Sequence, residues 1–197
     1  RDLHSTKGNI GSGDKGTRKF GTRDLHSTKG NIGSGTTHIS VLQKEVLEFL
    51  DPKPNQNFID GTLGGGGHAL AILSKIKPEG KLLALDLDAR LIERFRGRAS
   101  QILPLSDSGK IVLVNDNFAN LKKITERYNF SEVDGILVDL GWSFDQIESS
   151  GRGFSFQKNE PLDMRYSISQ ELTAREVVNK WPQDKIEKVL KEYGQER

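Results

Sequence analysis

Short apolar runs alternate with longer mixed segments through most of the chain. Four of these runs predict buried strands, at residues 58–59, 82–85, 111–114 and 136–138. Between them lie segments of helical length, at residues 68–77, 89–103 and 117–129. Strands that alternate with helices in this way are typical of a parallel sheet covered on both faces. We therefore expect an α/β fold with a doubly wound parallel sheet, which binds its ligand at the carboxyl ends of the strands.

The first 35 residues do not share this pattern. Residues 1–13 recur unchanged as residues 23–35, whereas natural repeats diverge in sequence. The segment holds eight glycines and few apolar residues, so it cannot bury enough surface to offset its loss of chain entropy. We interpret residues 1–35 as a duplicated, disordered tail. A phosphate-binding glycine loop at residues 8–13 is the weaker alternative, because no apolar strand precedes it.

The tail also accounts for the basic balance of the chain. The whole sequence has a formal charge of +2, and the tail contributes about +4 through seven Lys and Arg against three Asp, which leaves about −2 for the rest. This balance predicts no strong unspecific binding to nucleic acid. The absence of cysteine excludes disulfides, cysteine-ligated metals and thiolate nucleophiles. Outside the tail only His38 and His68 remain, far apart in the sequence, so we expect no metal site.

Each predicted strand is followed by a turn rich in glycine, aspartate or asparagine. These turns lie at residues 60–68, 86–88, 115–118 and 139–142. Glycines after the first strand let the backbone approach a ligand closely, and an acid after the second can accept hydrogen bonds from ribose hydroxyls. Helix caps and tight turns explain any one of the four but not all of them together.

Two classes of cofactor fit this layout. The turn at residues 64–69 matches the dinucleotide fingerprint, and Asp86 follows at the expected distance. Residues 58–70 contain no Lys or Arg to bind a pyrophosphate, whereas Asp60, Asp86 and Asp139 complement the sulfonium and ammonium of S-adenosylmethionine. We therefore favour S-adenosylmethionine, and an NAD-type oxidoreductase remains the alternative.

Six motifs then follow one another in order: residues 38–42 (HISVL), 60–68 (DGTLGGGGH), 133–141 (VDGILVDLG), 152–156 (RGFSF), 161–165 (PLDMR) and 193–197 (YGQER). In these motifs the chain resembles the bacterial 16S ribosomal RNA cytosine-N4 methyltransferases, the MraW family, over residues 38–197. The resemblance implies a class I methyltransferase fold with an inserted helical RNA-recognition domain. It also implies S-adenosylmethionine as methyl donor and a decoding-region cytidine as acceptor.

The resemblance divides the chain and suggests its partners. We expect residues 36–150 to form the N-terminal half of the methyltransferase domain and residues 151–197 to begin the helical insert, without the later strands. A half-sheet of this kind exposes the apolar edge of its fourth strand. The implied partner is 16S-type ribosomal RNA or the small ribosomal subunit, and a homodimer is left open. No apolar run spans a bilayer and no signal peptide is found, so we expect a cytoplasmic protein without membrane contacts.

The resemblance also places cofactor contacts by position, on Gly66, Gly67, His68, Asp86, Phe118, Asp139 and Gln146. The charge argument adds Asp60 to this set. For His68, a capping or cofactor-orienting role is favoured over that of a general base. The chain departs from the family pattern at Ser40, which replaces a proline, at Trp142 and Phe144, which replace small residues, and at residues 166–167, which replace Met-Asp.

Two residues after the fourth strand are the catalytic candidates. The N4 amine of cytosine is a weak nucleophile, so the site must accept its proton and hold the methyl group in line. Asp139 is the predicted proton acceptor, and Trp142 is predicted to stack on a flipped base. The alternatives are that Asp139 only binds cofactor and that Trp142 packs in the core. A C5-methylating mechanism needs a cysteine, and the chain has none.

Arginines and aromatic residues after position 150 are candidates for RNA binding. Arg152 and Arg165 are predicted to contact RNA phosphates, unless they are simply solvated. Phe154 and Phe156 are expected to anchor their loop in the core. A third hypothesis, a non-catalytic RNA-binding fragment, also fits these residues, and it predicts no methyl transfer.

Overall fold

The computed structural model describes residues 40–104, 107 and 110–196. The predicted tail at residues 1–35 lies outside this part of the chain. The strands are β1 (Asn57–Asp60), β2 (Leu82–Asp86), β3 (Ile111–Asn115) and β4 (Val133–Leu137). The helices up to β4 are α1 (Gln43–Leu50), α2 (Gly67–Ile76), α3 (Ala89–Ile102), the 3₁₀ turn η2 (Phe118–Asn120) and α4 (Leu121–Arg127). After β4 come α5 (Phe144–Ser149), α6 (Ala174–Lys180) and α7 (Gln183–Gly194).

The four strands form one parallel sheet in the order β3-β2-β1-β4. Ile59 in β1 pairs with Leu83 of β2 on one side and with Ile136 of β4 on the other. The chain thus builds outward from β1 to β3 and then returns to the opposite side of β1. In sheets of this kind the ligand binds where the strand order reverses, which here is between β1 and β4.

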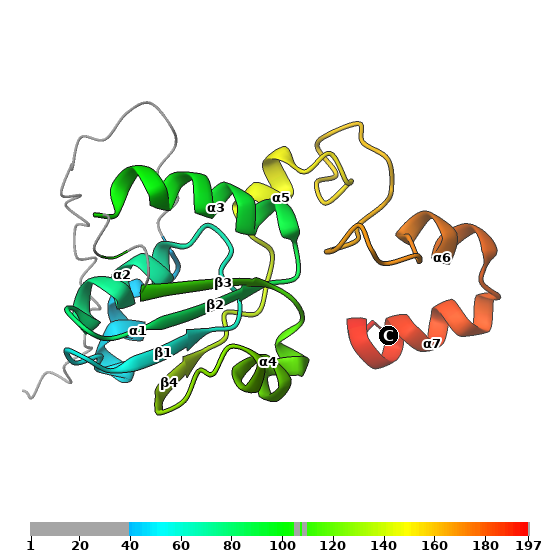
Figure 1. Cartoon of the computed structure of the whole chain (residues 1–197). Coiled ribbons are helices and arrows are strands. Elements are labelled where there is room, and N and C mark those ends of the chain that lie inside the picture. Colours follow the sequence, from blue (N-terminus) through cyan, green and yellow to red (C-terminus); the bar gives the residue numbers. More distant parts are fainter. Residues whose placement is uncertain (1–39, 105–106, 108–109, 197) are drawn as a thin grey trace, which may run out of the picture. The chain divides into compact units, whose positions relative to one another are not determined.

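Both faces of the sheet are covered by helices, as the sequence predicts. Phe58 and Leu82 point into an apolar cluster with residues of α2 and α3, whereas Ile59 and Leu83 point into a second cluster with Ile124 of α4. Figure 1 shows α3 on one side of the sheet and α4 on the other. Because side chains alternate between the faces of a strand, consecutive apolar residues in β1 and β2 bury both faces at once. The predicted doubly wound α/β class is confirmed.

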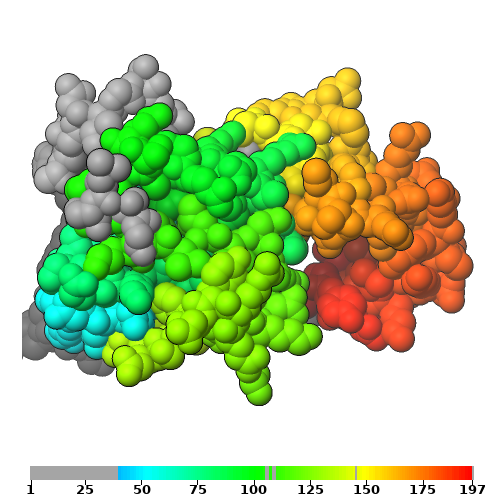
Figure 2. All heavy atoms as spheres, in the orientation of Figure 1, coloured from blue at the N-terminus to red at the C-terminus, as the bar shows by residue number. Residues whose placement is uncertain are grey.

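The fourth strand differs from its predicted position. It begins at Val133 rather than at residue 136, because Gly135 leaves room for the ring of Phe58 beside the backbone. A side chain at Gly135 would lie 2.5 Å from that ring. Among the described strands β4 lies at one edge of the sheet, and Ile136 and Val138 are both exposed. In Figure 2 the yellow-green residues around β4 lie at the surface.

Two of the helices after β4, α5 and α6, are short and start with side-chain caps. Ser143 and Gln146 form a reciprocal capping box at α5, and Thr173 and Glu176 form another at α6. Each box satisfies backbone N–H groups that the first turn of a helix leaves without partners. Within the described ranges, no helix has both the length and the apolar character needed to cross a membrane.

Candidate functional site

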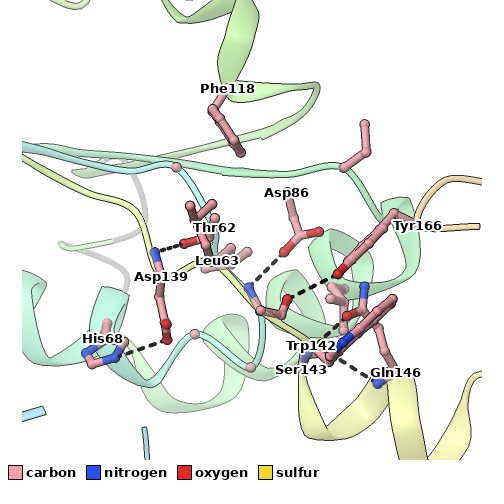
Figure 3. Close-up of a pocket in the computed structure, with 18 of the residues that line it drawn as sticks. Thr62, Leu63, His68, Asp86, Phe118, Asp139, Trp142, Ser143, Gln146 and Tyr166 are labelled. Atoms are coloured by element: carbon pink, nitrogen blue, oxygen red, sulfur yellow. Dashed lines mark hydrogen bonds and ion pairs between the residues drawn. The ribbon is translucent and has the colours of Figure 1, made fainter. Parts of the chain in front are cut away.

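A cavity of about 580 Å³ lies at the carboxyl ends of the strands. It collects the turns that follow all four strands, so the predicted meeting of these turns is observed. Eight residues predicted from the sequence line it, namely Gly66, Gly67, His68, Asp86, Phe118, Asp139, Trp142 and Gln146. Their roles in binding or catalysis stay predictions. Figure 3 labels six of them around the cavity, namely His68, Asp86, Phe118, Asp139, Trp142 and Gln146.

The turn after β1 takes a shape that requires glycine. Gly66 has a φ of +74°, and a Cβ there would lie 2.1 Å from the buried ring of Phe95. Gly64 also has a positive φ, and its amide donates a hydrogen bond of 2.8 Å to the carboxylate of Asp86. Residues with a Cβ rarely adopt such positive φ angles, so the turn requires glycine at these two positions. In this conformation the turn lies against the end of β2.

Asp86 ends β2 and faces the cavity. One of its oxygens accepts the Gly64 amide and the other accepts the amide of Asp88 at 2.8 Å. Burial raises the pKa of the Asp86 carboxyl above its usual range. Each carboxylate oxygen has a second lone pair, so the fixed carboxylate can still accept hydrogen bonds from a ligand.

Asp139 lies just beyond the end of β4, on the side of the cavity next to the turn after β1. Its amide donates to the hydroxyl oxygen of Thr62 at 2.7 Å, which ties the two turns together. Its carboxylate is half exposed and lies 3.7 Å from Nε2 of the largely buried His68 (Figure 3). The carboxylate is therefore held at the cavity wall and is still accessible to a ligand.

Asp60 does not line the cavity, although the sequence predicts a cofactor contact for it. The residue is 1% exposed and lies behind the turn, where Oδ1 accepts the amide of Thr62 at 3.0 Å. Oδ2 has no hydrogen-bond partner among the described residues. Burial, together with the negative charges of Asp86 and Asp139, raises the pKa of Asp60 to about 7. This placement makes Asp60 a support of the turn and corrects the predicted direct contact.

The charged side chains that line the cavity are acidic. Asp86, Asp116 and Asp139 line it, and none of the lining residues that the structure describes is a lysine or an arginine. The wall is therefore unfavourable for a pyrophosphate and favourable for a cation. No group of three or more His, Asp or Glu side chains suited to hold a metal ion is found in the described ranges.

Aromatic side chains form part of the cavity wall. Phe118 at the start of η2 is part-exposed and faces the cavity from the β3 side, whereas Trp142 faces it from the β4 side (Figure 3). Trp142 is about half exposed and stacks on Tyr166, with ring centroids 4.8 Å apart. The core-packing alternative for Trp142 does not agree with this exposure.

The two arginines predicted to contact RNA are engaged within the protein. Arg152 is 4% exposed, forms a buried ion pair with Asp88 and donates to the carbonyls of Arg165 and Tyr166 at 2.8 and 2.9 Å. A phosphate contact by Arg152 does not agree with this placement, because its guanidinium is enclosed. The guanidinium of Arg165 is paired with both oxygens of Asp163 at 2.8 Å, and its RNA contact stays a prediction.

Thr62 and Tyr166 belong to the site but are not among the site residues predicted from the sequence. Thr62 joins the turns after β1 and β4, and Tyr166 contributes a ring to the cavity wall. Thr62 lies within the glycine motif at residues 60–68, so the motif itself indicates that Thr62 is close to the site. Tyr166 is signalled only by its departure from the family pattern. The expected anchoring role of Phe156 is wrong, because its side chain is 98% exposed.

The fold and the cavity together define a class of protein. A parallel sheet ordered β3-β2-β1-β4, with a glycine turn after its first strand and a fixed acid at the end of its second, is a Rossmann-like nucleoside-cofactor fold. The acidic lining of the cavity is unfavourable for the pyrophosphate of a dinucleotide. Comparison with known families then gives a particular assignment: the chain belongs to the MraW methylase family, which it matches over residues 35–197.

Curated proteins similar to this chain include several named ribosomal RNA small subunit methyltransferase H. The chain is 43% identical over 160 residues to the ribosomal RNA small subunit methyltransferase H of Syntrophotalea carbinolica, which covers 81% of this chain and 49% of that protein. It is 40% identical to the protein of the same name from Clostridium botulinum, over 81% and 50% of the two chains. The chain therefore spans about half the length of the curated relatives it matches.

Solved structures similar to this one include two RNA methylases. One is a putative rRNA-methylase from Clostridium thermocellum, with a TM-score of 0.44, 15% identity and 54% of each chain covered. Another is an rRNA methylase from Streptococcus thermophilus, with a TM-score of 0.40 and 19% identity over 49% of this chain and 53% of that chain.

Proposed function

We propose that this chain carries the cofactor-binding part of an S-adenosylmethionine-dependent methyltransferase that acts on the N4 amine of a cytidine in small-subunit ribosomal RNA. The observation that carries the proposal is the acidic cavity at the switch point of the sheet. Membership of the MraW methylase family and the names of the curated relatives support the reaction class. Because the chain spans about half of those relatives, its activity, RNA substrate and ribosomal partner all belong to the proposal.

The residues around the cavity fit S-adenosylmethionine. The volume of about 580 Å³ is within the range of small-molecule sites. Gly64 and Gly66 keep the turn after β1 free of side chains, and Asp86 holds a fixed carboxylate for the ribose hydroxyls. Phe118 offers a ring against which adenine packs, and the carboxylate of Asp139 complements positive charge. When bound, S-adenosylmethionine supplies an electrophilic methyl group.

Asp139 is the proposed proton acceptor. The N4 amine must lose a proton when it is methylated, and its lone pair is delocalised into the cytosine ring. A carboxylate within hydrogen-bond distance of the amine removes that proton and orients the remaining lone pair. Asp139 suits this role because Thr62 fixes its backbone while its carboxylate is half exposed to the cavity. His68, 3.7 Å from that carboxylate, orients it.

Trp142 is the proposed stacking surface for the base. Enzymes that modify a base hold it out of the helical stack against aromatic side chains. Trp142 lies three residues after Asp139 and lines the same cavity. A base stacked on its ring therefore lies close to the carboxylate that accepts its proton.

Ligand-dependent thermal stability tests the cofactor. We expect S-adenosylhomocysteine to raise the melting temperature of the chain and NADH to leave it unchanged, because binding to the native state alone stabilises it. Asp86→Asn should remove the shift. Asp184→Asn, an exposed acid in the first turn of α7, is the matched control and should keep it. A shift with NADH and none with S-adenosylhomocysteine would point to an oxidoreductase instead.

Nucleoside mass spectrometry tests the reaction. The chain is incubated with small-subunit ribosomal RNA and S-adenosylmethionine, and the digested RNA is searched for N4-methylcytidine. Asp139→Asn is expected to lower the yield about 100-fold or more, the typical contribution of a positioned acid or base. Cofactor binding without any methylated product supports the non-catalytic reading of this chain.

A further inference from the structure

Three aromatic rings from separate parts of the chain meet beside the cavity. Trp142 follows β4, Phe154 follows α5, and Tyr166 comes before α6. The rings of Trp142 and Tyr166 are nearly parallel, with an interplanar angle of 8° and centroids 4.8 Å apart. Phe154 meets Trp142 at a tilt, with centroids 4.7 Å apart. Figure 3 shows Tyr166 alongside Trp142.

The backbone around Trp142 offers little to hold its ring. Gly141 precedes it, and a Cβ built there would meet no atom within 4 Å. The tryptophan side chain is also about half exposed. Since an exposed side chain on an open loop samples several rotamers, the orientation of this ring depends on its aromatic neighbours.

Tyr166, in contrast, is firmly attached. The carbonyls of Arg165 and Tyr166 accept hydrogen bonds from one nitrogen of Arg152, and the other nitrogen of that guanidinium pairs with Asp88. Asp88 caps α3 and donates its amide to Asp86. The backbone of Tyr166 is thereby connected through buried groups to the end of β2. The carboxylate of Asp86, which is proposed to bind the cofactor, lies at that end.

We propose that Tyr166 is the positioning residue that holds the ring of Trp142 in the orientation that receives the acceptor base. The inference deepens the proposed function and rests on it for the identity of that base. Stacking is the interaction that matters, so any planar ring of similar size at position 166 should serve. The phenol hydroxyl contributes little, because its distance to the Gly141 carbonyl is 3.5 Å.

Tryptophan fluorescence tests the positioning directly. The chain has two tryptophans, so Trp181→Phe leaves Trp142 as the only one. In this background, acrylamide should quench Trp142 less readily than it quenches a free tryptophan amide. Tyr166→Leu should raise the quenching constant about twofold, and Tyr166→Phe should restore the original value. Tyr128→Leu, at the end of α4, is the matched control and should not change it.

A second readout separates positioning from structural damage. In the methyl-transfer assay, Tyr166→Leu should raise the KM for RNA about tenfold, in line with the energy of one base stacked on an aromatic ring. S-adenosylhomocysteine should still raise the melting temperature of this variant, because the turns that bind it are intact.

Two results overturn the inference. One is an unchanged quenching constant in a folded Tyr166→Leu protein. The other is quenching of Trp142 in the Trp181→Phe protein as fast as that of free tryptophan amide, which decides the matter even if Tyr166→Leu does not fold. Neither measurement requires methyl transfer, so a failure of the proposed function is seen separately, as the absence of N4-methylcytidine.

Discussion

Two regions of this molecule are ordered in different ways. In the sheet region, residues 57–130, the described chain has eighteen buried apolar side chains from Phe58 to Phe130. In the polar segment, residues 143–196, the buried side chains that the structure describes are Gln146, Arg152 and Ser167, and none is apolar.

The difference shows what holds each region. Apolar burial stabilises the sheet region, and each buried Leu or Ile contributes on the order of 2 kcal/mol. The polar segment relies on capping boxes, on the Arg152–Asp88 pair and on the Arg165–Asp163 pair. Hydrogen bonds of this kind contribute about 1 kcal/mol each to stability. The folding of the polar segment therefore depends on a few groups, and the loss of any one of them lowers its stability measurably.

The largest effect is expected at Arg152. Arg152→Met should lower the free energy of unfolding by about 4 kcal/mol, because it leaves Asp88 buried without its partner. Urea denaturation followed by circular dichroism measures the loss. Arg175→Met, on the exposed surface of α6, is the matched control and should change stability by less than about 0.5 kcal/mol. Equal costs for the two variants would show that the polar segment does not depend on Arg152.

The next effect belongs to the sheet region. Leu83→Ala in the centre of β2 should cost about 3 kcal/mol, since its side chain is fully buried in the apolar cluster that contains Ile124 of α4. Leu190→Ala in α7 removes the same atoms from a half-exposed position and should cost less than about 1 kcal/mol. The same denaturation measurement compares the two. A loss at Leu190 as large as that at Leu83 would contradict the division into two regions.

The third effect is a pH dependence within the sheet region. The pKa of Asp60 is raised to about 7 by burial, so the native state binds a proton that the unfolded state has already released. Stability should therefore fall as pH rises, by about 2 kcal/mol between pH 5 and pH 7 from this group. Asp60→Asn should make the profile flatter over that interval. An unchanged slope in the variant would assign the pH dependence to other groups, Asp86 among them.

The smallest effects compare glycines of the two regions. Gly151 has a φ of +68° and Gly97 lies within α3, and a Cβ at either would meet nothing within 4 Å. Gly151→Ala should cost about 1 kcal/mol because of backbone strain. Gly97→Ala should instead stabilise the chain by up to about 1 kcal/mol, through helix propensity. Melting temperatures that shift in the same direction for both variants would refute this difference.

The sheet region was the more predictable from the sequence. Its apolar runs mark β1 to β3 closely, because consecutive buried residues are needed to cover both faces of a parallel sheet. The pattern does not indicate the start of β4, because Asp134 and Gly135 are not typical strand residues and the fit of Gly135 depends on the neighbouring ring of Phe58. The first turn after β3 was expected to be helical and is the 3₁₀ turn η2 instead, with Asn117 as its cap.

The site was predictable where its residues lie in turns after strands. The positions of Asp86 and Asp139 follow from the rule that the carboxyl ends of parallel strands meet. The predicted cofactor contact of Asp60 is wrong, because the pattern of apolar and polar residues does not show that this carboxyl is buried behind the turn. The role of Arg152 could not be predicted either, since its partners Asp88 and Tyr166 are distant in sequence. The sequence pattern thus indicates residues around the cavity but not the buried groups, such as Asp60 and Arg152, that support them.

The pairing of β4 with β1 determines when the turns that follow these two strands come together during synthesis. β1, β2 and β3 emerge from the ribosome in order and each can pair with the strand before it. The other edge of β1 stays open until residues 133–137 have been made, because Asp60 pairs with Leu137. Closing such a long loop is a slow step in folding. The edge of the cavity between β1 and β4 is therefore formed late, after β1, β2 and β3 have been made.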